Sequence, residues 1–165
     1  MDSEVTNLAD VKSFDPADYA PATPETCMLR LATSVVSFTP TGAYTLLQQT
    51  GNWDAQPPNP NFDPLTGLYT VPSTGVYRVS CGISFRFTLP GETQASRIYV
   101  NGTSVAQGQA NTTGNWPVPG GSILLSLAAG DTVGLYVYIS ASGRNLVGDA
   151  LSPGSTQMSI NKVSS

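Results

Sequence analysis

The side chains most often used in acid–base and nucleophilic catalysis are sparse in this sequence. Its 165 residues include no histidine, the side chain that titrates near neutral pH and the usual partner of catalytic serine, cysteine and zinc. Ser159 and Lys162 match the Ser-x-x-Lys pattern of some acyl-enzymes. Residues three apart on a β-strand point to opposite faces, however, so these two side chains could not meet. The sequence therefore predicts a protein that is not an enzyme.

The acidic residues offer few combinations for a carboxylate pair or a metal site. Beyond residue 25 they are Asp54, Asp63, Glu92, Asp131 and Asp149, a thin supply for paired glycosidase carboxylates. A calcium site built from Asp63, Asp149 and loop carbonyls is conceivable, but it falls short of the roughly six to eight oxygens that calcium takes. We therefore predict no cofactor and no metal. Cys27 and Cys81 are expected to be free, small hydrophobic residues.

One aromatic residue stands in a segment suited to recognition. Trp116 lies in the Gly- and Asn-rich stretch from Gly108 to Gly121. An exposed tryptophan between flexible residues suits glycan or protein binding. The alternative is that Trp116 covers the open end of the fold. Both interpretations stay open from the sequence.

The charge of the chain is concentrated at its amino-terminal end. Residues 1–25 hold six acidic side chains and one lysine, whereas the remainder holds six basic and five acidic residues. No basic patch is left on which a phosphate backbone could release counterions, so nucleic-acid binding is not expected. No apolar run approaches the roughly 18 residues of a membrane span, and no signal peptide is recognised. These features predict assembly in the cytoplasm.

The first 27 residues are expected to form an extended acidic arm ahead of a domain from residue 28 to 165. The arm contains Pro16, Pro21 and Pro24 and too few apolar side chains to fold alone. Its sizeable apolar anchors, which we predict to hold the arm on a partner, are Leu8, Val11, Phe14 and Tyr19.

From residue 28 onward the pattern is one of β-strands separated by turns. Residues 76–87 alternate strictly, with Tyr77, Val79, Cys81, Ile83 and Phe85 on one side, which predicts a half-buried strand. Further strands are predicted over residues 28–38, 43–49, 97–101, 122–127, 132–140 and 156–163. Strands of this length without helical periodicity indicate an all-β antiparallel sandwich of jelly-roll type.

The segment from Thr132 to Ser140 has two unlike faces. One face is an aliphatic row suited to the core, made up of Val133, Leu135, Val137 and Ile139. The opposite row is Gly134, Tyr136 and Tyr138. Tyrosine, with an apolar ring and a polar tip, is common at interfaces. We predict that this second face contacts sister copies of the chain.

Three stretches resemble the complement-type globular heads of the tumour-necrosis-factor-like jelly rolls. Residues 62–72 read FDPLTGLYTVP and precede Gly75-Val76-Tyr77; residues 97–102 read RIYVNG; residues 121–127 and 130–133 read GSILLSL and GDTV. In this context Gly67 and Gly75 are expected to supply turn conformations, and Asp131 to bond the backbone of its own turn.

The resemblance implies a homotrimer in which Gly134, Tyr136 and Tyr138 face the threefold axis. The chain lacks a collagen-like stalk, and bacteriophages use similar heads on capsids and tail tips. We therefore expect a virion structural protein, a capsid decoration or cement protein whose arm binds the major capsid protein. The alternative is a tail-fibre or receptor-binding tip that recognises host glycan.

Overall fold

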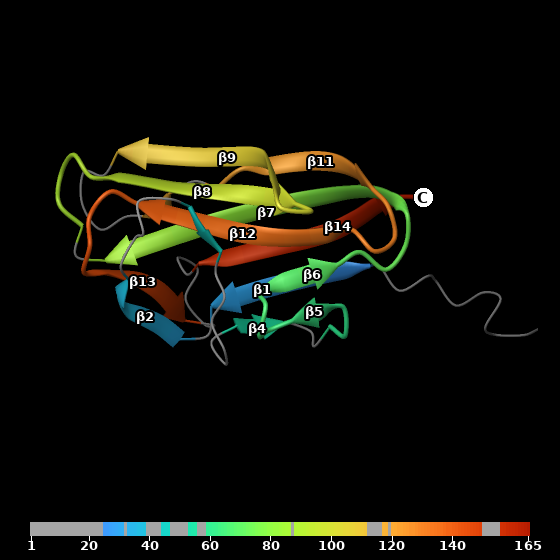
Figure 1. Ribbon diagram of the computed structural model, residues 1–165, viewed down its shortest axis with the longest axis horizontal. Helices are drawn as coiled ribbons and strands as arrows, with labels where there is room; N and C mark the ends of the chain where they lie inside the picture. The colour runs from blue at the N-terminus through green and yellow to red at the C-terminus, as the bar shows by residue number, and fades with distance from the viewer. Residues whose placement is uncertain are drawn as a thin grey trace, which may run out of the picture.

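The protein is a sandwich of two antiparallel sheets (Figure 1). The computed structural model describes residues 25–31, 33–38, 44–46, 53–55, 59–86, 88–111, 117–118, 120–149 and 156–165. The described residues contain strands and turns and no helix, as the sequence predicts. Among them, no helix is long and apolar enough to cross a membrane.

The larger sheet has eight strands and joins the first and last strands of the fold. Its strands are β1 (Thr26–Leu31), β2 (Thr33–Phe38), β4 (Trp53–Ala55), β7 (Gly75–Arg86), β10 (Pro117–Val118), β11 (Ser122–Leu127), β13 (Arg144–Asp149) and β14 (Gln157–Ser164). They follow the order β2-β13-β7-β14-β1-β4, and β10 and β11 also pair with β7. Strand β7 is therefore the centre of this sheet.

The smaller sheet has six strands. They are β3 (Thr45–Leu46), β5 (Phe62–Asp63), β6 (Leu68–Thr70), β8 (Thr93–Val100), β9 (Thr103–Asn111) and β12 (Thr132–Ile139). The order is β5-β6-β12-β8-β9, with β3 pairing to β12. The register places Tyr136 opposite Arg97 and Gly134 opposite Tyr99.

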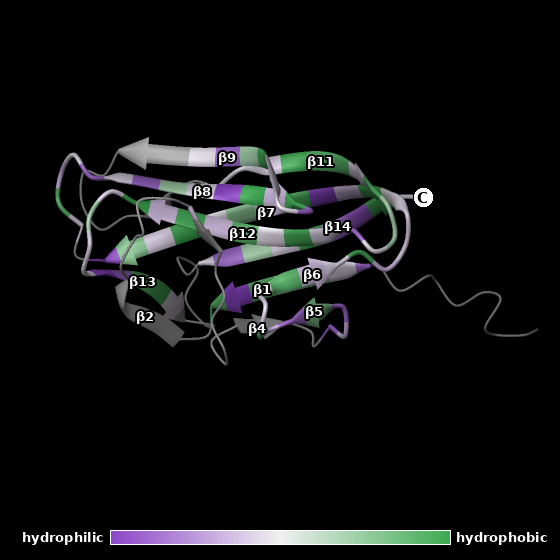
Figure 2. Ribbon diagram, viewed as in Figure 1, coloured by the Kyte–Doolittle hydropathy of each residue, from purple (hydrophilic) through white to green (hydrophobic). Residues whose placement is uncertain are grey.

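The core lies between β7 and β12, as their alternation predicts. Tyr77, Val79, Ile83 and Phe85 of β7 are at most 1% exposed, and so are Val133, Leu135, Val137 and Ile139 of β12. Each such side chain contributes about 1.5–3 kcal/mol when it leaves water. Figure 2 shows the alternation as green bands separated by pale or purple ones along β8 and β12. The inward rows are thus confirmed as core.

The two cysteines are free and buried, as expected. Burial raises the pKa of the Cys27 thiol to about 11 and also raises that of Cys81. Cys81 Sγ lies 3.6 Å from Ser96 Oγ within the core. Both thiols therefore behave as small apolar groups at neutral pH.

Several boundaries differ from the sequence prediction. Strand β1 begins at Thr26, and Cys27 belongs to the core, so the last residues assigned to the arm are part of the domain. Strand β9 extends to Asn111, inside the predicted loop that starts at Gly108. Its residues show no alternation, but pairing with β8 satisfies their backbone groups.

The structure confirms the predicted turn role for Gly67 but not for Gly75. Gly67 has a φ of 70°, the left-handed conformation expected of a turn. Gly75 is instead the first residue of β7, and a Cβ there would lie 2.5 Å from the carbonyl oxygen of Ser164. It is needed for close packing against β14, so the predicted turn role of Gly75 is wrong.

A second close approach yields a stability prediction. A Cβ on Gly120 would fall 1.0 Å from the backbone oxygen of Cys81, whereas one on Gly82 would meet nothing within 4 Å. Gly120→Ala should therefore displace the backbone and cost about 2 kcal/mol or more, which lowers Tm by roughly 6 °C in a chain of this length. Gly82→Ala, the matched control, should leave Tm nearly unchanged. Calorimetry checks both, and equal Tm values for the two variants would contradict the predicted clash.

Candidate functional site

Four tyrosines and one arginine gather on the outward face of the six-stranded sheet. We call this group the tyrosine face: Tyr44, Arg97, Tyr99, Tyr136 and Tyr138. Direct cross-strand partners share one face of a sheet, and the register pairs Tyr136 with Arg97 and Gly134 with Tyr99. The core-facing residues of β12 are buried, whereas Tyr136 and Tyr138 are only partly buried.

The rings of the tyrosine face contact one another. Tyr99 and Tyr136 are stacked with ring centroids 3.8 Å apart and an interplanar angle of 25°. Tyr44 and Tyr138 lie 5.5 Å apart in a tilted arrangement. The guanidinium carbon of Arg97 sits 3.7 Å from the centroid of the Tyr44 ring, within the range of a cation–π contact. The rings are therefore held in place inside a single chain.

Gly134 explains how the stacked pair forms. It stands directly opposite Tyr99 in the ladder and is buried. Because it has no side chain, the Tyr99 ring can lean across to its diagonal neighbour Tyr136, which is within reach of an aromatic side chain. The structure thus brings together Gly134, Tyr136 and Tyr138, the residues that the sequence assigned to a trimer interface. It gives the tyrosines partners within the chain, and their contact with sister copies stays a prediction.

The tyrosine face includes three residues that the sequence did not predict for this site: Arg97, Tyr99 and Tyr44. Arg97 Nε donates a hydrogen bond to Gln107 Oε1 at 2.7 Å, so β9 also contributes to the tyrosine face. A signal existed for Arg97 and Tyr99, which alternate along one strand. Tyr44 is distant in sequence and is placed only by the fold.

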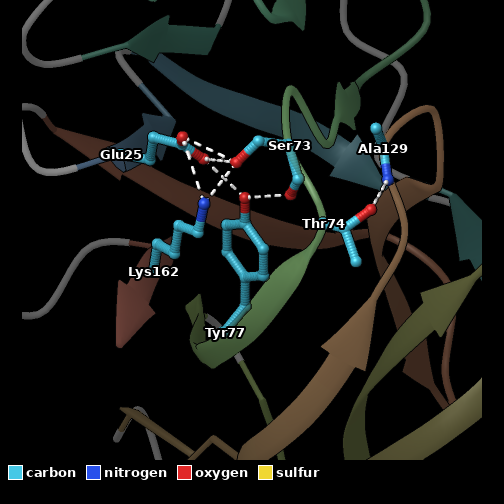
Figure 3. A network of polar contacts seen from close by, with 6 residues as sticks. All are labelled: Glu25, Ser73, Thr74, Tyr77, Ala129 and Lys162. Atoms are coloured by element: carbon cyan, nitrogen blue, oxygen red, sulfur yellow. Dashed lines mark hydrogen bonds and ion pairs between the residues drawn. The ribbon is translucent and has the colours of Figure 1, made fainter. Parts of the chain in front are cut away.

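A second polar cluster fixes the point where the first 24 residues join the sandwich. Glu25 accepts hydrogen bonds from Ser73 Oγ at 2.7 Å and from Tyr77 Oη at 2.5 Å (Figure 3). Lys162 Nζ lies 3.4 Å from the Glu25 carboxylate and also donates to Ser73 Oγ. The backbone N–H of Lys162 donates to the carbonyl of Glu25 at 2.9 Å. We call these four residues the arm anchor.

The arm anchor contains a serine and a lysine in contact, but their hydrogen bonds are those of a stabilising network and not of a catalytic pair. The Ser73 hydroxyl donates to Glu25 and accepts from the Lys162 ammonium, so neither group is arranged to activate the other. Lys162 thus meets Ser73 of a neighbouring segment, not Ser159 of its own strand. The hydrogen bond from Tyr77, followed by those from Ser73 and the charge of Lys162, lowers the pKa of Glu25 despite partial burial.

The remaining described acids serve turns and one ion pair. Asp63 accepts from the N–H of Leu65, and Asp131 accepts from the N–H of Ala128, each at 2.8 Å. The predicted turn role of Asp131 is thereby confirmed. Glu92 forms an ion pair with Arg144. Within the described ranges, no group of three or more potential metal ligands lies together. Of the two aspartates considered for calcium, Asp63 serves its own turn, and the side chain of Asp149 is not described.

Other predicted residues lie outside the described residues. They are the arm residues Leu8, Val11, Phe14 and Tyr19, and Trp116 of the proposed recognition loop.

Comparisons with known proteins support the fold alone. No protein-family model and no curated protein sequence matches the chain. Solved structures do match: Eiger TNF from S. frugiperda has a TM-score of 0.60 at 17% identity, covering 85% of this chain and 92% of that one. Murine APRIL has a TM-score of 0.56 at 14% identity, covering 84% and 98%. The chain therefore has a TNF-like jelly-roll fold.

The arm anchor predicts a pH dependence of stability. The pKa of Glu25 is lower in the folded protein than in the unfolded chain, so its stabilisation is complete above the ordinary glutamate pKa of about 4.5 and is lost as the pH falls through the lower value. Glu25 is partly exposed, so Glu25→Gln should cost about 1 kcal/mol at pH 7 and less at about pH 3, where the carboxyl of the unfolded chain is protonated.

Urea unfolding of both proteins at the two pH values measures this difference. Tyr77→Phe, which removes the principal donor, should raise the pKa of Glu25 and move the loss to higher pH. A Glu25→Gln penalty that does not change with pH would contradict the assigned role.

Proposed function

We propose that the protein is a homotrimeric virion structural unit, a decoration or cement protein that binds the major capsid protein through its first 24 residues. The sandwich is then the outer knob, and it performs no chemistry. A threefold unit fits the local threefold positions of an icosahedral shell. Three arms on one trimer also bind together, so that modest contacts per arm multiply through effective concentration.

The observation that carries this proposal is the arm anchor. An arm whose base is fixed to the body holds that body in a defined place on its partner. Glu25 fixes the base through side-chain bonds to Ser73 and Tyr77 and a backbone bond with Lys162. The acidic, proline-containing segment ahead of it carries apolar residues at Leu8, Val11, Phe14 and Tyr19, which suits a segment that orders on a partner.

For the trimer contact we favour the outward face of the eight-stranded sheet. Leu124 lies within β11 and is 57% exposed, and Met28 of β1 is 37% exposed. One rung of the ladder runs from Ser122 through Ser80 and Ser159 to Met28, and its serines permit close approach of a second surface. On a neighbouring rung, Leu124 lies opposite the exposed Arg78. The other strongly exposed large apolar residues described are in turns or near the chain end: Leu65, Leu89 and Val163.

The tyrosine face supports a second candidate function, a receptor-binding tip. Tyrosine and arginine are, with tryptophan, the residues enriched at binding hot spots. In that case the outward face of the six-stranded sheet stays free of the trimer contact and meets the host. Cryo-microscopy of particles separates the two functions, since cement proteins cover the shell and tip proteins occupy the end of a tail or fibre.

Deletion of residues 2–24 tests the arm. We expect a folded trimer that no longer binds shells assembled from the major capsid protein, because Glu25 and the anchor are retained. Replacing only Leu8, Val11, Phe14 and Tyr19 by serine should weaken binding to a similar degree. Co-sedimentation with shells measures both. Undiminished co-sedimentation of the deletion variant would refute attachment through the arm.

The trimer contact is tested by a matched pair of surface variants. Leu124→Asp places a charge in the favoured contact and should convert the trimer to monomers, whereas Tyr136→Ser should leave a trimer. Analytical ultracentrifugation reads the mass, and thermal unfolding confirms that both variants fold. The reverse result would assign the contact to Gly134, Tyr136 and Tyr138, as predicted from the sequence. A monomeric parent protein would end the trimer proposal.

A further inference from the structure

We propose that the tyrosine face is a binding site for a carboxylate-bearing sugar, with Arg97 as the residue that binds the carboxylate. The inference deepens the second candidate function and rests on it. The proposed sugar site lies on the six-stranded sheet and does not include Trp116.

Arg97 is positioned as a receptor for an acid. Its guanidinium lies over the Tyr44 ring, and its Nε is bonded to Gln107. These contacts fix the plane of the guanidinium group. The ion pairs among the described residues are Arg144–Glu92 and Lys162–Glu25. Among the described residues, therefore, the two terminal nitrogens of Arg97 have no carboxylate partner. A planar edge of this kind matches a carboxylate with two parallel hydrogen bonds.

The four acids whose side chains are described do not compete for Arg97. Asp63 and Asp131 bind their own turns. Glu25 belongs to the arm anchor, and Glu92 to the ion pair with Arg144. An external acid is thus the partner that electrostatic complementarity favours.

The rings supply the remainder of a sugar site. Each tyrosine offers an apolar ring and a polar hydroxyl, which matches the alternation of C–H and hydroxyl groups on a pyranose. The contacts Tyr99–Tyr136 and Tyr44–Tyr138 hold these rings before a ligand arrives. Little side-chain freedom is lost on binding, and this preorganisation favours affinity.

The size of the tyrosine face favours a small ligand over a protein. Across the sheet the group spans three neighbouring strand positions: Tyr44 next to β3, the tyrosines of β12, and Arg97 and Tyr99 on β8. Neighbouring strands are about 4.8 Å apart and residues rise about 3.4 Å, so the group covers an area of about 10 by 14 Å. A stable protein interface needs about 800 Å² per partner. One or two sugar rings fit the smaller area, with an affinity near the millimolar range that three copies would strengthen.

Titration of the full chain with sialyllactose, a glucuronic-acid disaccharide and lactose tests the site, with saturation-transfer NMR as the readout. We expect saturable binding of at least one acidic sugar and at least tenfold weaker binding of lactose. Arg97→Gln should weaken the acidic sugar at least tenfold. Arg86→Gln, an exposed arginine on β7 of the other sheet, is the matched control and should bind as the parent does.

Three results would overturn the proposal: neither acidic sugar binds, lactose binds equally well, or Arg97→Gln has no effect. Binding of a synthetic peptide of residues 2–25 through Arg97, with no sugar bound, would assign the face to the acidic arm and also overturn it. Because the measurement uses the isolated protein, its failure leaves the attachment of the arm to shells as a separate question.

Discussion

The hydrophobic core that β7 and β12 share is the feature on which the others depend. Both strands present unbroken rows of apolar side chains inward, from Tyr77 to Phe85 and from Val133 to Ile139. In a strand, fixing one row inward fixes the other outward, because the side-chain period is two. Burial of the aliphatic row of β12 therefore places Tyr136 and Tyr138 on the outer surface, and burial of Tyr77 brings its hydroxyl to Glu25.

The same constraint separates the two outward faces by character. The eight-stranded sheet presents serines, the apolar side chains of Leu124 and Met28 and the charged side chain of Arg78, whereas the six-stranded sheet presents rings and a guanidinium. The small side chains of the first face suit contact with an identical surface, and the preformed rings of the second suit binding of a different molecule. In the proposed assembly, the trimer contact and the recognition site would then use opposite sides of one sandwich.

The sequence predicts the elements whose side chains alternate, and fails where they do not. Strands β7, β11 and β12 were predicted within one residue or two because one row of each is apolar. Strand β9 was missed since TSVAQGQAN has no alternation, and β13 since Leu146, Val147 and Gly148 are buried in succession. These strands form because their backbones pair with adjacent strands. Which strands will be adjacent cannot be read from the local sequence pattern.

The site follows the same rule. Tyr136 and Tyr138 stand out within one strand, but their partner Arg97 requires the register between β8 and β12. The arm anchor joins Glu25 to residues 48, 52 and 137 positions away, and no local pattern connects them. Residues that are paired across the fold become visible only when the fold is known.

The arm anchor has a practical consequence for the fusion of foreign peptides to this protein. Because the Lys162 amide bonds to the Glu25 carbonyl, a peptide fused after Ser165 would emerge close to Glu25, where the proposed attachment arm begins. The loop from Ser140 to Gly143 connects β12 to β13 of the other sheet. It is largely exposed and lies at the opposite end of the sandwich (Figure 1), so it is the better insertion point for a foreign epitope.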